Sequence, residues 1–274
     1  MTARTSTHDD EQPDTARTER GTDGDGPSRE RPPAVAVDGV SHAFGDLDVL
    51  GGVSFSVDPG TVACIVGPNG SGKTTLLRAV ADLLEPDAGA VSVAGDGGRR
   101  VGYLAQQPAF RGQFTVAETV GFYGALVDEA VDTDAILERV GLSAVADRRV
   151  DALSGGMRRL LGIAQTTVGD PSVFALDEPA NGLDPTMARR LGTVIGDLAA
   201  DGGTVLLSTH DMHAVDRLAD TVLVVDHGRL VAAGPPEDLL DETGASTLDA
   251  AIETLGQGGD AVGVAPGLHG GARQ

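Results

Sequence analysis

A glycine-rich segment near the start of the chain has the residue types and spacing of a phosphate-binding loop. Glycines let backbone N–H groups turn inward around a phosphate, and a helix that begins directly after the loop adds positive potential. The lysine of such a loop reaches the β- and γ-phosphates, and the next hydroxyl ligates Mg²⁺. The segment fits G-x-x-x-x-G-K-[ST] and predicts a nucleoside triphosphate site, against the alternative of a chance glycine-rich turn: Gly67-Pro68-Asn69-Gly70-Ser71-Gly72-Lys73-Thr74.

Lys73 is the only lysine in the chain; the other 19 of the 20 basic residues are arginines. Because the composition avoids lysine elsewhere, position 73 is expected to need the compact charge of an ammonium group. Few lysines and 41 Asp and Glu resemble the composition of proteins from salt-loving organisms, and a generic acidic bacterial protein is the alternative. The net charge of -21 repels phosphate backbones, so no nucleic-acid partner is expected.

Two neighbouring acids follow an apolar run later in the chain. Asp177 ends the run 173–176, where a carboxylate is costly unless it binds a cation or donor groups, so a Mg²⁺ role is expected. Glu178 follows at once and is the natural group to accept a proton from an attacking water. The alternative is a solvated Asp-Glu pair at a strand end.

A third segment, Ser154-Gly155-Gly156, opens a predicted helix with Ser154 as its N-cap. Free N–H groups and the positive end of the helix would form a second phosphate site.

The elements around these residues are predicted to be short buried strands followed by helices. Residues 62–66 are continuously apolar, which suits a buried parallel strand, and apolar spacing predicts a helix over Lys73–Leu84. Val173–Leu176 and Val205–Leu207 are predicted as further buried strands, with a helix over Thr186–Ala199 between them.

The first part of the chain divides near residue 34. Residues 1–33 have almost nothing to bury and are expected to form a disordered acidic tail. Alternating apolar residues at 35–40 and again at 53–57 predict antiparallel strands that turn at Gly51-Gly52.

The middle of the chain, Thr115 to about Thr167, is predicted to be helical. Thr115 with Glu118 three residues later is a capping-box signature. Further helical patterns cover Ala135–Val140 and Met157–Ala164.

Toward the end, Val222–Val225 and Leu230–Val231 predict a hairpin that turns at His227-Gly228. A helix is expected from Pro236, and the Gly-rich residues 256–274 are expected to form a frayed tail. No apolar run approaches the roughly 18 residues that cross a bilayer, and residues 1–33 lack a signal-peptide stretch, so a chain made without secretion is expected. Cys64, the only cysteine, allows no internal disulfide.

Four further motifs follow the phosphate loop, in this order: Leu153-Ser154-Gly155-Gly156-Met157, Leu176-Asp177-Glu178-Pro179, Gly182-Leu183-Asp184-Pro185 and Thr209-His210. Their order and spacing resemble the ATP-binding cassette, the nucleotide-binding subunit of ABC transporters. The resemblance covers roughly Ala34 to Leu255. It implies an α/β P-loop NTPase fold with a mixed central sheet, an N-terminal antiparallel β subdomain and an α-helical signature subdomain at about 115–167.

The resemblance also implies roles for single residues. Glu178 accepts the proton, His210 is the switch histidine that contacts the γ-phosphate, and Gln106 senses Mg²⁺ and water. Thr74, Gln106 and Asp177 are the implied Mg²⁺ ligands. The implied ATP-binding residues are Phe44, Gly67, Pro68, Asn69, Gly70, Ser71, Gly72, Lys73, Thr74, Thr75, Ser154, Gly155, Gly156 and Asp184. Phe44 either stacks on adenine or is a core residue, and the remaining histidines are expected at the surface or in packing: His8, His42, His213, His227 and His269.

Two partners are implied by the resemblance. A second copy pairs head to tail, so that its Ser154-Gly155-Gly156 segment covers the ATP of the first and Asp184 lies at the seam. A polytopic permease on another chain holds the cassette at the inner face of the cell membrane. Phe110 and Phe114 flank Arg111 and form either the pocket for a permease helix or ordinary core packing.

The leading expectation is therefore the ATPase subunit of a transporter. The 154–159 and 181–185 segments resemble exporter-type cassettes, which favours export. Met157 stands where the signature commonly has Gln, so a polar contact is lost while the backbone donors remain. The alternative is a soluble cassette without a transport role, of a chromosome-maintenance, ribosome-associated or iron–sulfur assembly type. Long coiled-coil heptads, zinc-binding Cys pairs or a second cassette would favour the first two types and are absent from the sequence, so the assembly type is harder to exclude.

Overall fold

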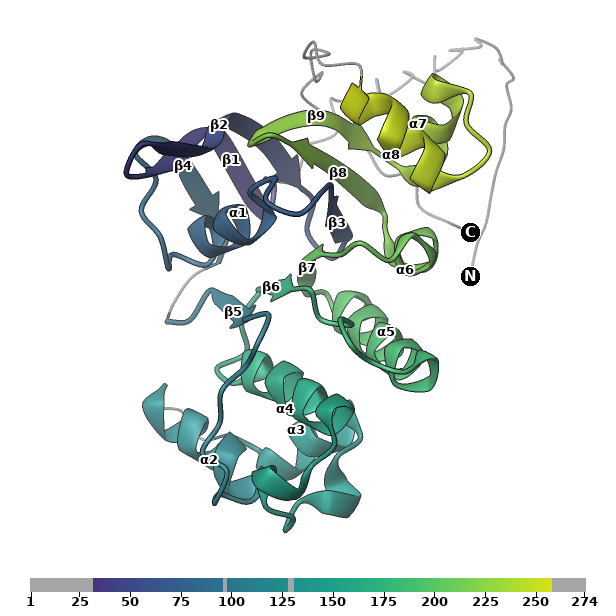
Figure 1. Ribbon diagram of the computed structural model, residues 1–274. Helices are drawn as coiled ribbons and strands as arrows, with labels where there is room; N and C mark the ends of the chain where they lie inside the picture. The colour runs from purple at the N-terminus through teal and green to yellow at the C-terminus, as the bar shows by residue number, and fades with distance from the viewer. Residues whose placement is uncertain (1–31, 96–97, 128–130, 258–274) are drawn as a thin grey trace, which may run out of the picture. The chain divides into compact units, whose positions relative to one another are not determined.

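The computed structural model describes residues 32–95, 98–127 and 131–257 (Figure 1). All but the inner two residues of each expected tail, 1–33 and 256–274, lie outside the described residues.

A six-stranded mixed sheet forms the centre of the described part. Its order is β5-β6-β7-β3-β8-β9, and all neighbours are parallel except the hairpin of β8 and β9. The predicted mixed sheet is confirmed. The strands are β3 (Val62–Val66), β5 (Val101–Leu104), β6 (Val173–Asp177), β7 (Thr204–Ser208), β8 (Thr221–Asp226) and β9 (Arg229–Gly234).

A separate antiparallel sheet has the order β2-β1-β4, from β1 (Val35–Phe44), β2 (Leu47–Val57) and β4 (Ala88–Val93). The hairpin turns at Gly45-Asp46, so the predicted turn at Gly51-Gly52 was wrong. Both glycines lie inside β2, where the register with β1 shifts, and Gly52 has a φ of 72°. The Gly51 N–H donates to the Gly228 carbonyl in the β8–β9 turn at 2.8 Å. This contact with a distant turn keeps the glycines within the strand, where they form an irregularity in its pairing and not a hairpin turn.

Helix α1 (Lys73–Val80) packs between the two sheets. Alternate residues of β3 face opposite cores: Ala63 and Ile65 join the α1 side, whereas Val62, Cys64 and Val66 join the other. The helix ends four residues earlier than predicted. Asp82 has a φ of 57°, outside the helical region, and Leu83 is 60% exposed. The apolar spacing in the sequence therefore extends beyond the residues that the core buries.

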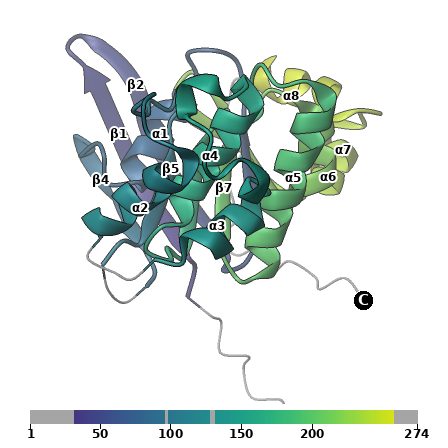
Figure 2. The same ribbon diagram turned by 90° about the horizontal axis from the view of Figure 1, so that it is seen from below.

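The opposite face of the sheet is covered by α4 (Gly155–Thr167), α5 (Pro185–Ala200), α6 (Met212–Leu218), α7 (Pro236–Thr243) and α8 (Leu248–Gln257). Figure 2 shows the antiparallel sheet on one side and α5 to α8 on the other. Helices α6 and α8 had no counterpart in the sequence analysis, and the last two residues of α8 belong to the stretch expected to fray.

Helices α2 (Val116–Leu126), α3 (Thr133–Val140) and α4 pack on one another and are called the α2–α4 unit below. The predicted capping box is confirmed: Thr115 Oγ1 accepts the Glu118 N–H, and a Glu118 carboxylate oxygen accepts the Thr115 N–H.

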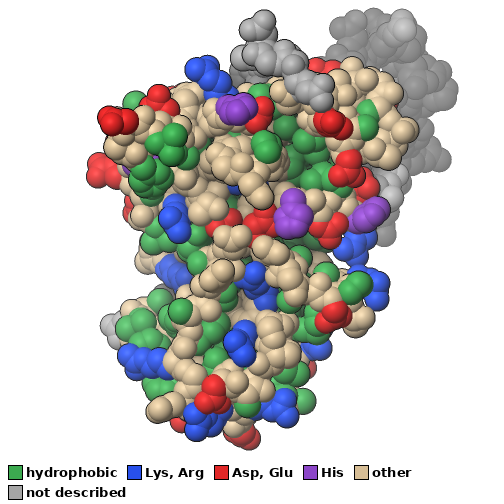
Figure 3. Space-filling view, in the orientation of Figure 1, with side chains coloured by type: hydrophobic (Ala, Val, Ile, Leu, Met, Phe, Trp, Pro, Cys, Tyr) green, Lys and Arg blue, Asp and Glu red, His purple; other side chains and the backbone are tan. Residues whose placement is uncertain are grey.

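Charged side chains divide between these regions. On the face shown in Figure 3, arginines gather over the part that carries the α2–α4 unit, and most Asp and Glu side chains lie over the sheets and α7–α8. None of the helices in the described ranges has the length and apolar character that crossing a bilayer requires.

Candidate functional site

The loop 67–72 joins β3 to α1, and two of its positions can be occupied only by glycine. Gly67 has a φ of 143°, and a Cβ there would lie 1.9 Å from the Val225 carbonyl oxygen. Gly72 has a φ of 102°, and a Cβ there would lie 2.8 Å from the Val49 carbonyl oxygen. The backbone of the loop is therefore held against β8 and β2, and its direction leads straight into the N-terminus of α1.

Lys73, the first residue of α1, turns back under this loop. Its Nζ donates to the carbonyl oxygens of Gly67 and Pro68, both at 2.8 Å, and the residue is only 7% exposed. Burial lowers the pKa of the ammonium group, while the negative charges of Glu178 and Asp177 act in the opposite direction. The structure thus places the single lysine beside both acids that the sequence singled out.

Asp177 ends β6 and is bound by two hydroxyl groups. Its Oδ1 accepts a hydrogen bond from Thr74 Oγ1 at 3.1 Å and another from Ser208 Oγ at 2.7 Å. Asp177 is 1% exposed, so its carboxylate faces the phosphate loop and away from bulk solvent. The expected proximity of Thr74 and Asp177 is observed, whereas Ser208 was absent from the sequence analysis.

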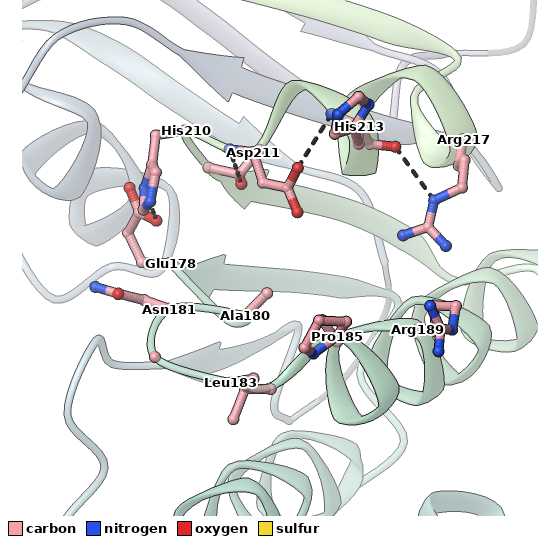
Figure 4. Close-up of a pocket in the computed structure, with 13 residues that line it drawn as sticks. Glu178, Ala180, Asn181, Leu183, Pro185, Arg189, His210, Asp211, His213 and Arg217 are labelled. Atoms are coloured by element: carbon pink, nitrogen blue, oxygen red, sulfur yellow. Dashed lines mark hydrogen bonds and ion pairs between the residues drawn. The ribbon is translucent and has the colours of Figure 1, made fainter.

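Glu178 and His210 meet at the ends of adjacent strands. Glu178 Oε2 lies 2.9 Å from His210 Nδ1, and the two side chains face one another in Figure 4. Glu178 has a φ of 47°, a left-handed conformation that is strained for a residue with a side chain. The carboxyl ends of parallel strands lie at one edge of the sheet, and this edge is where ligands bind in open α/β sheets. We call Lys73, Thr74, Asp177, Glu178, Ser208 and His210 the strand-end site.

A hollow of about 690 Å³ opens beside Glu178 and His210. It is lined by the 180–185 loop, by the start of α6, and by Arg189 and Arg217. Asp184 caps α5, because its Oδ1 accepts the Thr186 and Met187 N–H groups at 2.9 and 3.1 Å. Asp184 lies just outside the residues that line the hollow, on the loop that bounds it.

The Ser154 segment belongs to the α2–α4 unit. Ser154 Oγ accepts the Met157 N–H at 3.2 Å, which confirms the predicted N-cap. Ser154 and Gly155 are exposed, and a Cβ built at Gly155 would meet no atom within 4 Å. Among the described hydrogen bonds, none joins Ser154 to the phosphate loop of the same chain.

Gln106 is exposed, and its backbone is held by a buried arginine. Arg159 in α4 is 8% exposed, and its Nη1 donates to the carbonyl oxygens of Gln106 and Ala105. Burial lowers the pKa of its guanidinium, and Asp177 and Glu178 oppose that shift. Arg159 therefore connects the α2–α4 unit to the segment after β5. The sequence analysis missed Arg159. The signal that could have found it is its place on the apolar face of α4, where an arginine needs hydrogen-bond partners.

Phe44 lies at the end of β1 and is 52% exposed, so it is not a core residue. Its ring contacts the His42 ring edge to face at 4.7 Å between centroids. His42 is packed and His213 and His227 are exposed, as expected; His8 and His269 lie outside the described residues.

The aromatic residues around Arg111 form a cluster on the α2–α4 unit. The Arg111 guanidinium carbon lies 5.2 Å from the Phe114 ring centroid and 4.6 Å from that of Phe122. Phe110 is half-buried and contacts Tyr123 at the same place.

Comparison with known proteins agrees with this geometry. Residues 50–181 match the family model described as ABC transporter. The chain is 37% identical to the daunorubicin resistance ATP-binding protein DrrA3 of Streptomyces coeruleorubidus, over 85% of this chain and 78% of the relative. It is also 37% identical to the Nod factor export ATP-binding protein I of Ralstonia nicotianae, over 78% of this chain and 71% of the relative.

Solved structures show the same fold. An ATP-binding subunit of an ABC transporter matches with a TM-score of 0.71 and 25% identity, over 81% of this chain and 99% of the other. The cbiO1 protein of Clostridium perfringens, described as part of an ABC transporter complex, matches with a TM-score of 0.69 and 27% identity, over 77% and 92%. The chain therefore belongs to the ABC transporter family as one of its ATP-binding cassettes, which hydrolyse ATP to drive transport.

Proposed function

We propose that the strand-end site hydrolyses ATP with Mg²⁺ and that the chain, paired with a second copy, drives a separate membrane permease that exports its substrate. The observation that carries the proposal is the convergence of one ammonium, two carboxylates and one imidazole at a single sheet edge, directly beside a phosphate-binding loop. Export is supported by the names of relatives that act in drug resistance and in Nod factor export. Residues 34–255 form the cassette, with 115–167 as its helical subdomain.

The loop and Lys73 hold the phosphates in this proposal. Loop N–H groups and the start of α1 supply donors, and the loop runs over Gly67, Pro68, Asn69, Gly70, Ser71 and Gly72 to Lys73, Thr74 and Thr75. Lys73 Nζ, now bonded to two loop carbonyls, lies where it can turn to the β- and γ-phosphates. Phe44 offers its exposed ring to the adenine.

The residues present fit a Mg²⁺ ion. Mg²⁺ takes oxygen ligands and is commonly held by one or two carboxylates together with substrate phosphates. Thr74 and Asp177 supply such oxygens side by side, and Gln106 would add an amide oxygen. Within the described ranges, no group of three or more His, Cys, Asp and Glu side chains gathers to hold a metal. Substrate phosphates and water would complete the coordination. The ion would neutralise negative charge on the transferred phosphoryl group.

Glu178 is the proton acceptor in this proposal. Its carboxylate is largely buried, at the edge of a hollow that opens beside it, and His210 holds one of its oxygens. The other oxygen would accept the proton of the attacking water. His210 is itself 66% exposed, so it can contact the γ-phosphate while it keeps Glu178 in place.

The second copy has a role in this proposal because the Ser154 side chain bonds within its own helix and, among the described hydrogen bonds, does not reach the phosphate loop of the same chain. Ser154 and Gly155 are exposed at the start of α4, which suits the triphosphate held by a partner, with Asp184 at the seam. Charge favours a head-to-tail arrangement, since the arginines of one α2–α4 unit would face the acidic sheet region of the other (Figure 3).

The aromatic cluster around Arg111 is the proposed permease contact. Half-buried rings and a cation held over two of them give a surface that suits an amphipathic helix of the permease. This contact would hold the cassette at the inner face of the cell membrane.

The test uses Glu178→Gln, which keeps the shape of the side chain and removes its capacity to accept a proton. Turnover should fall about 10³-fold while ATP affinity is retained, and light scattering should show an ATP-dependent dimer. Normal turnover contradicts the role of Glu178, and an unpaired chain in saturating ATP contradicts the dimer. Copurification with a polytopic membrane protein supports the transporter, and recovery with soluble partners alone favours the alternative of a cassette without a transport role.

A further inference from the structure

We infer that Ser208 is a positioning residue that fixes Asp177 and Glu178 relative to each other across the β6–β7 strand pair. The inference deepens the proposed function, because it rests on the roles given above to the two acids. Neither the phosphate loop nor any of the four other motifs includes Ser208.

The first observation is its place in the sheet. Ser208 ends β7 directly opposite Asp177, which ends β6, and it also pairs with Ile65 of β3 on the other side. Strands on both sides hold its backbone, and the residue is fully buried, with 0% exposure. Its hydroxyl therefore has a defined position that solvent does not perturb.

The second observation is that one hydroxyl binds both acids. Ser208 Oγ donates to Asp177 Oδ1 at 2.7 Å and accepts the Glu178 backbone N–H at 2.8 Å. A serine hydroxyl has a single proton to donate, and here it is committed to the Asp177 carboxylate. The same oxygen thus sets the rotation of one carboxylate and the backbone direction of the next residue.

The third observation is the conformation of Glu178. Its φ of 47° is unfavourable for a residue with a side chain, and such a conformation persists only where surrounding contacts hold it. The Ser208 bond to the Glu178 N–H is such a contact, and His210 holds the other end of the residue. Without Ser208, the peptide between the two acids is free to relax, and the proton acceptor turns with it.

The hydroxyl also shapes the Mg²⁺ side of the site. Thr74 and Ser208 both donate to Oδ1 of Asp177, so the carboxylate is held by two donors from two different elements. Groups that orient a metal ligand in this way commonly matter nearly as much as the ligand itself. Ser208 touches no nucleotide in this account and acts only through its two neighbours.

The test compares Ser208→Ala with a matched variant, Thr204→Val. Thr204 lies at the other end of β7, is 1% exposed, and its hydroxyl accepts the Gly60 N–H at 3.0 Å. Both changes remove one buried hydroxyl from the same strand, so both should lower the melting temperature. Only Ser208→Ala should change the chemistry.

For Ser208→Ala we expect kcat to fall about 10- to 100-fold and the Mg²⁺ concentration for half-maximal binding of a fluorescent ATP analogue to rise about 10-fold. Affinity for the analogue in EDTA should stay within about twofold, because the phosphate loop is unchanged. Ser208→Thr keeps the hydroxyl and should recover most of kcat.

Three results would overturn the inference: a Ser208→Ala enzyme within twofold of the parent in kcat and Mg²⁺ requirement, an equal loss of kcat in Thr204→Val, or a Ser208→Thr enzyme as stable as the parent with no recovery. Glu178→Gln is measured alongside. If that variant turns over normally, the roles proposed for the acids fail. If it stalls while Ser208→Ala is normal, only the role of Ser208 fails.

Discussion

The strand-end site and the α2–α4 unit both supply groups for ATP chemistry, but they hold them differently. In the strand-end site, Asp177 accepts hydrogen bonds from the Thr74 and Ser208 side chains, and Glu178 contacts His210. The Lys73 side chain is held by carbonyls of the phosphate loop. In the α2–α4 unit, Ser154 bonds only to its own helix and is exposed. The first region is organised within one chain, and the second presents a surface that another molecule must complete. Variants of the strand-end site should therefore lose ATP binding or turnover, whereas variants at the start of α4 should lose the ATP-dependent dimer.

Lys73→Met should have the largest effect on nucleotide binding. The change keeps a long side chain and removes the only ammonium group at the loop, so ATP affinity should fall at least about 100-fold by calorimetry. Lys73→Arg should also bind poorly, because a planar fork does not fit beside the Gly67 and Pro68 carbonyls as a point charge does. Parental affinity in Lys73→Arg would contradict this explanation of why one lysine is kept.

Ser154→Asp should separate pairing from binding. Asp and Asn are both good N-caps, so Ser154→Asp and Ser154→Asn should both fold with parental stability. The carboxylate would repel the phosphate of a partner, so Ser154→Asp should lose the ATP-dependent dimer and about 100-fold in turnover, with unchanged ATP affinity of the monomer. Light scattering in the Glu178→Gln background measures the dimer. If the Asp variant pairs like the Asn variant, phosphate is not bound at this helix start.

Arg159→Met should weaken the connection between the two regions. The methionine fills much of the same space but leaves the Gln106 and Ala105 carbonyls without their donor. We expect turnover to fall about 10-fold with little change in ATP affinity, because the segment that carries Gln106 loses its anchor. Steady-state kinetics provide the measurement, and Arg159→Lys, which retains the charge, should lie between Arg159→Met and the parent. A change confined to the KM for ATP would place Arg159 in binding.

Thr115→Ala should have the smallest effect and none on chemistry. It removes half of the capping box of α2, which costs about 1 kcal/mol and should lower the melting temperature by about 2–4 °C. ATP affinity and the turnover of the isolated protein should equal those of the parent, and Thr115→Ser should restore the melting temperature. Reduced turnover in Thr115→Ala would mean that the α2–α4 unit transmits local stability to the strand-end site.

The strand-end site was largely predictable because its chemistry lies in contiguous motifs. A buried apolar strand that ends in Asp177 and another that ends before His210 must bring both to one sheet edge if the strands are parallel. Ser208 was missed because its role depends on the register of β6 against β7, which sequence spacing does not contain. Arg159 was missed because the spacing of α4 shows that the position is buried, but not which carbonyls lie opposite.

Two predicted boundaries failed for a related reason. Gly51 and Gly52 carry the composition of a turn, yet the Gly51 N–H donates to the distant Gly228 carbonyl and the Gly52 N–H donates to Ser41 Oγ of β1, so tertiary pairing keeps both glycines inside β2. Leu83 continues the apolar spacing of α1, but its side chain is largely exposed, and the helix ends at Val80. In both cases local composition was outweighed by a surface made of residues far away in the sequence.

The alternation of β3 between two cores has a consequence for large mutational surveys of this chain. Ala63 and Ile65 pack with the antiparallel sheet, and Cys64 and Val66 pack with the helices on the other face. Because β3 runs directly into Gly67, repacking either layer shifts the base of the loop. Substitutions at Phe55 or Leu160, remote from any nucleotide, would then score as affinity defects. A survey that measures ATP affinity alone would assign too many residues to the binding site. A parallel measurement of folding would separate the residues that bind ATP from those that only support the fold.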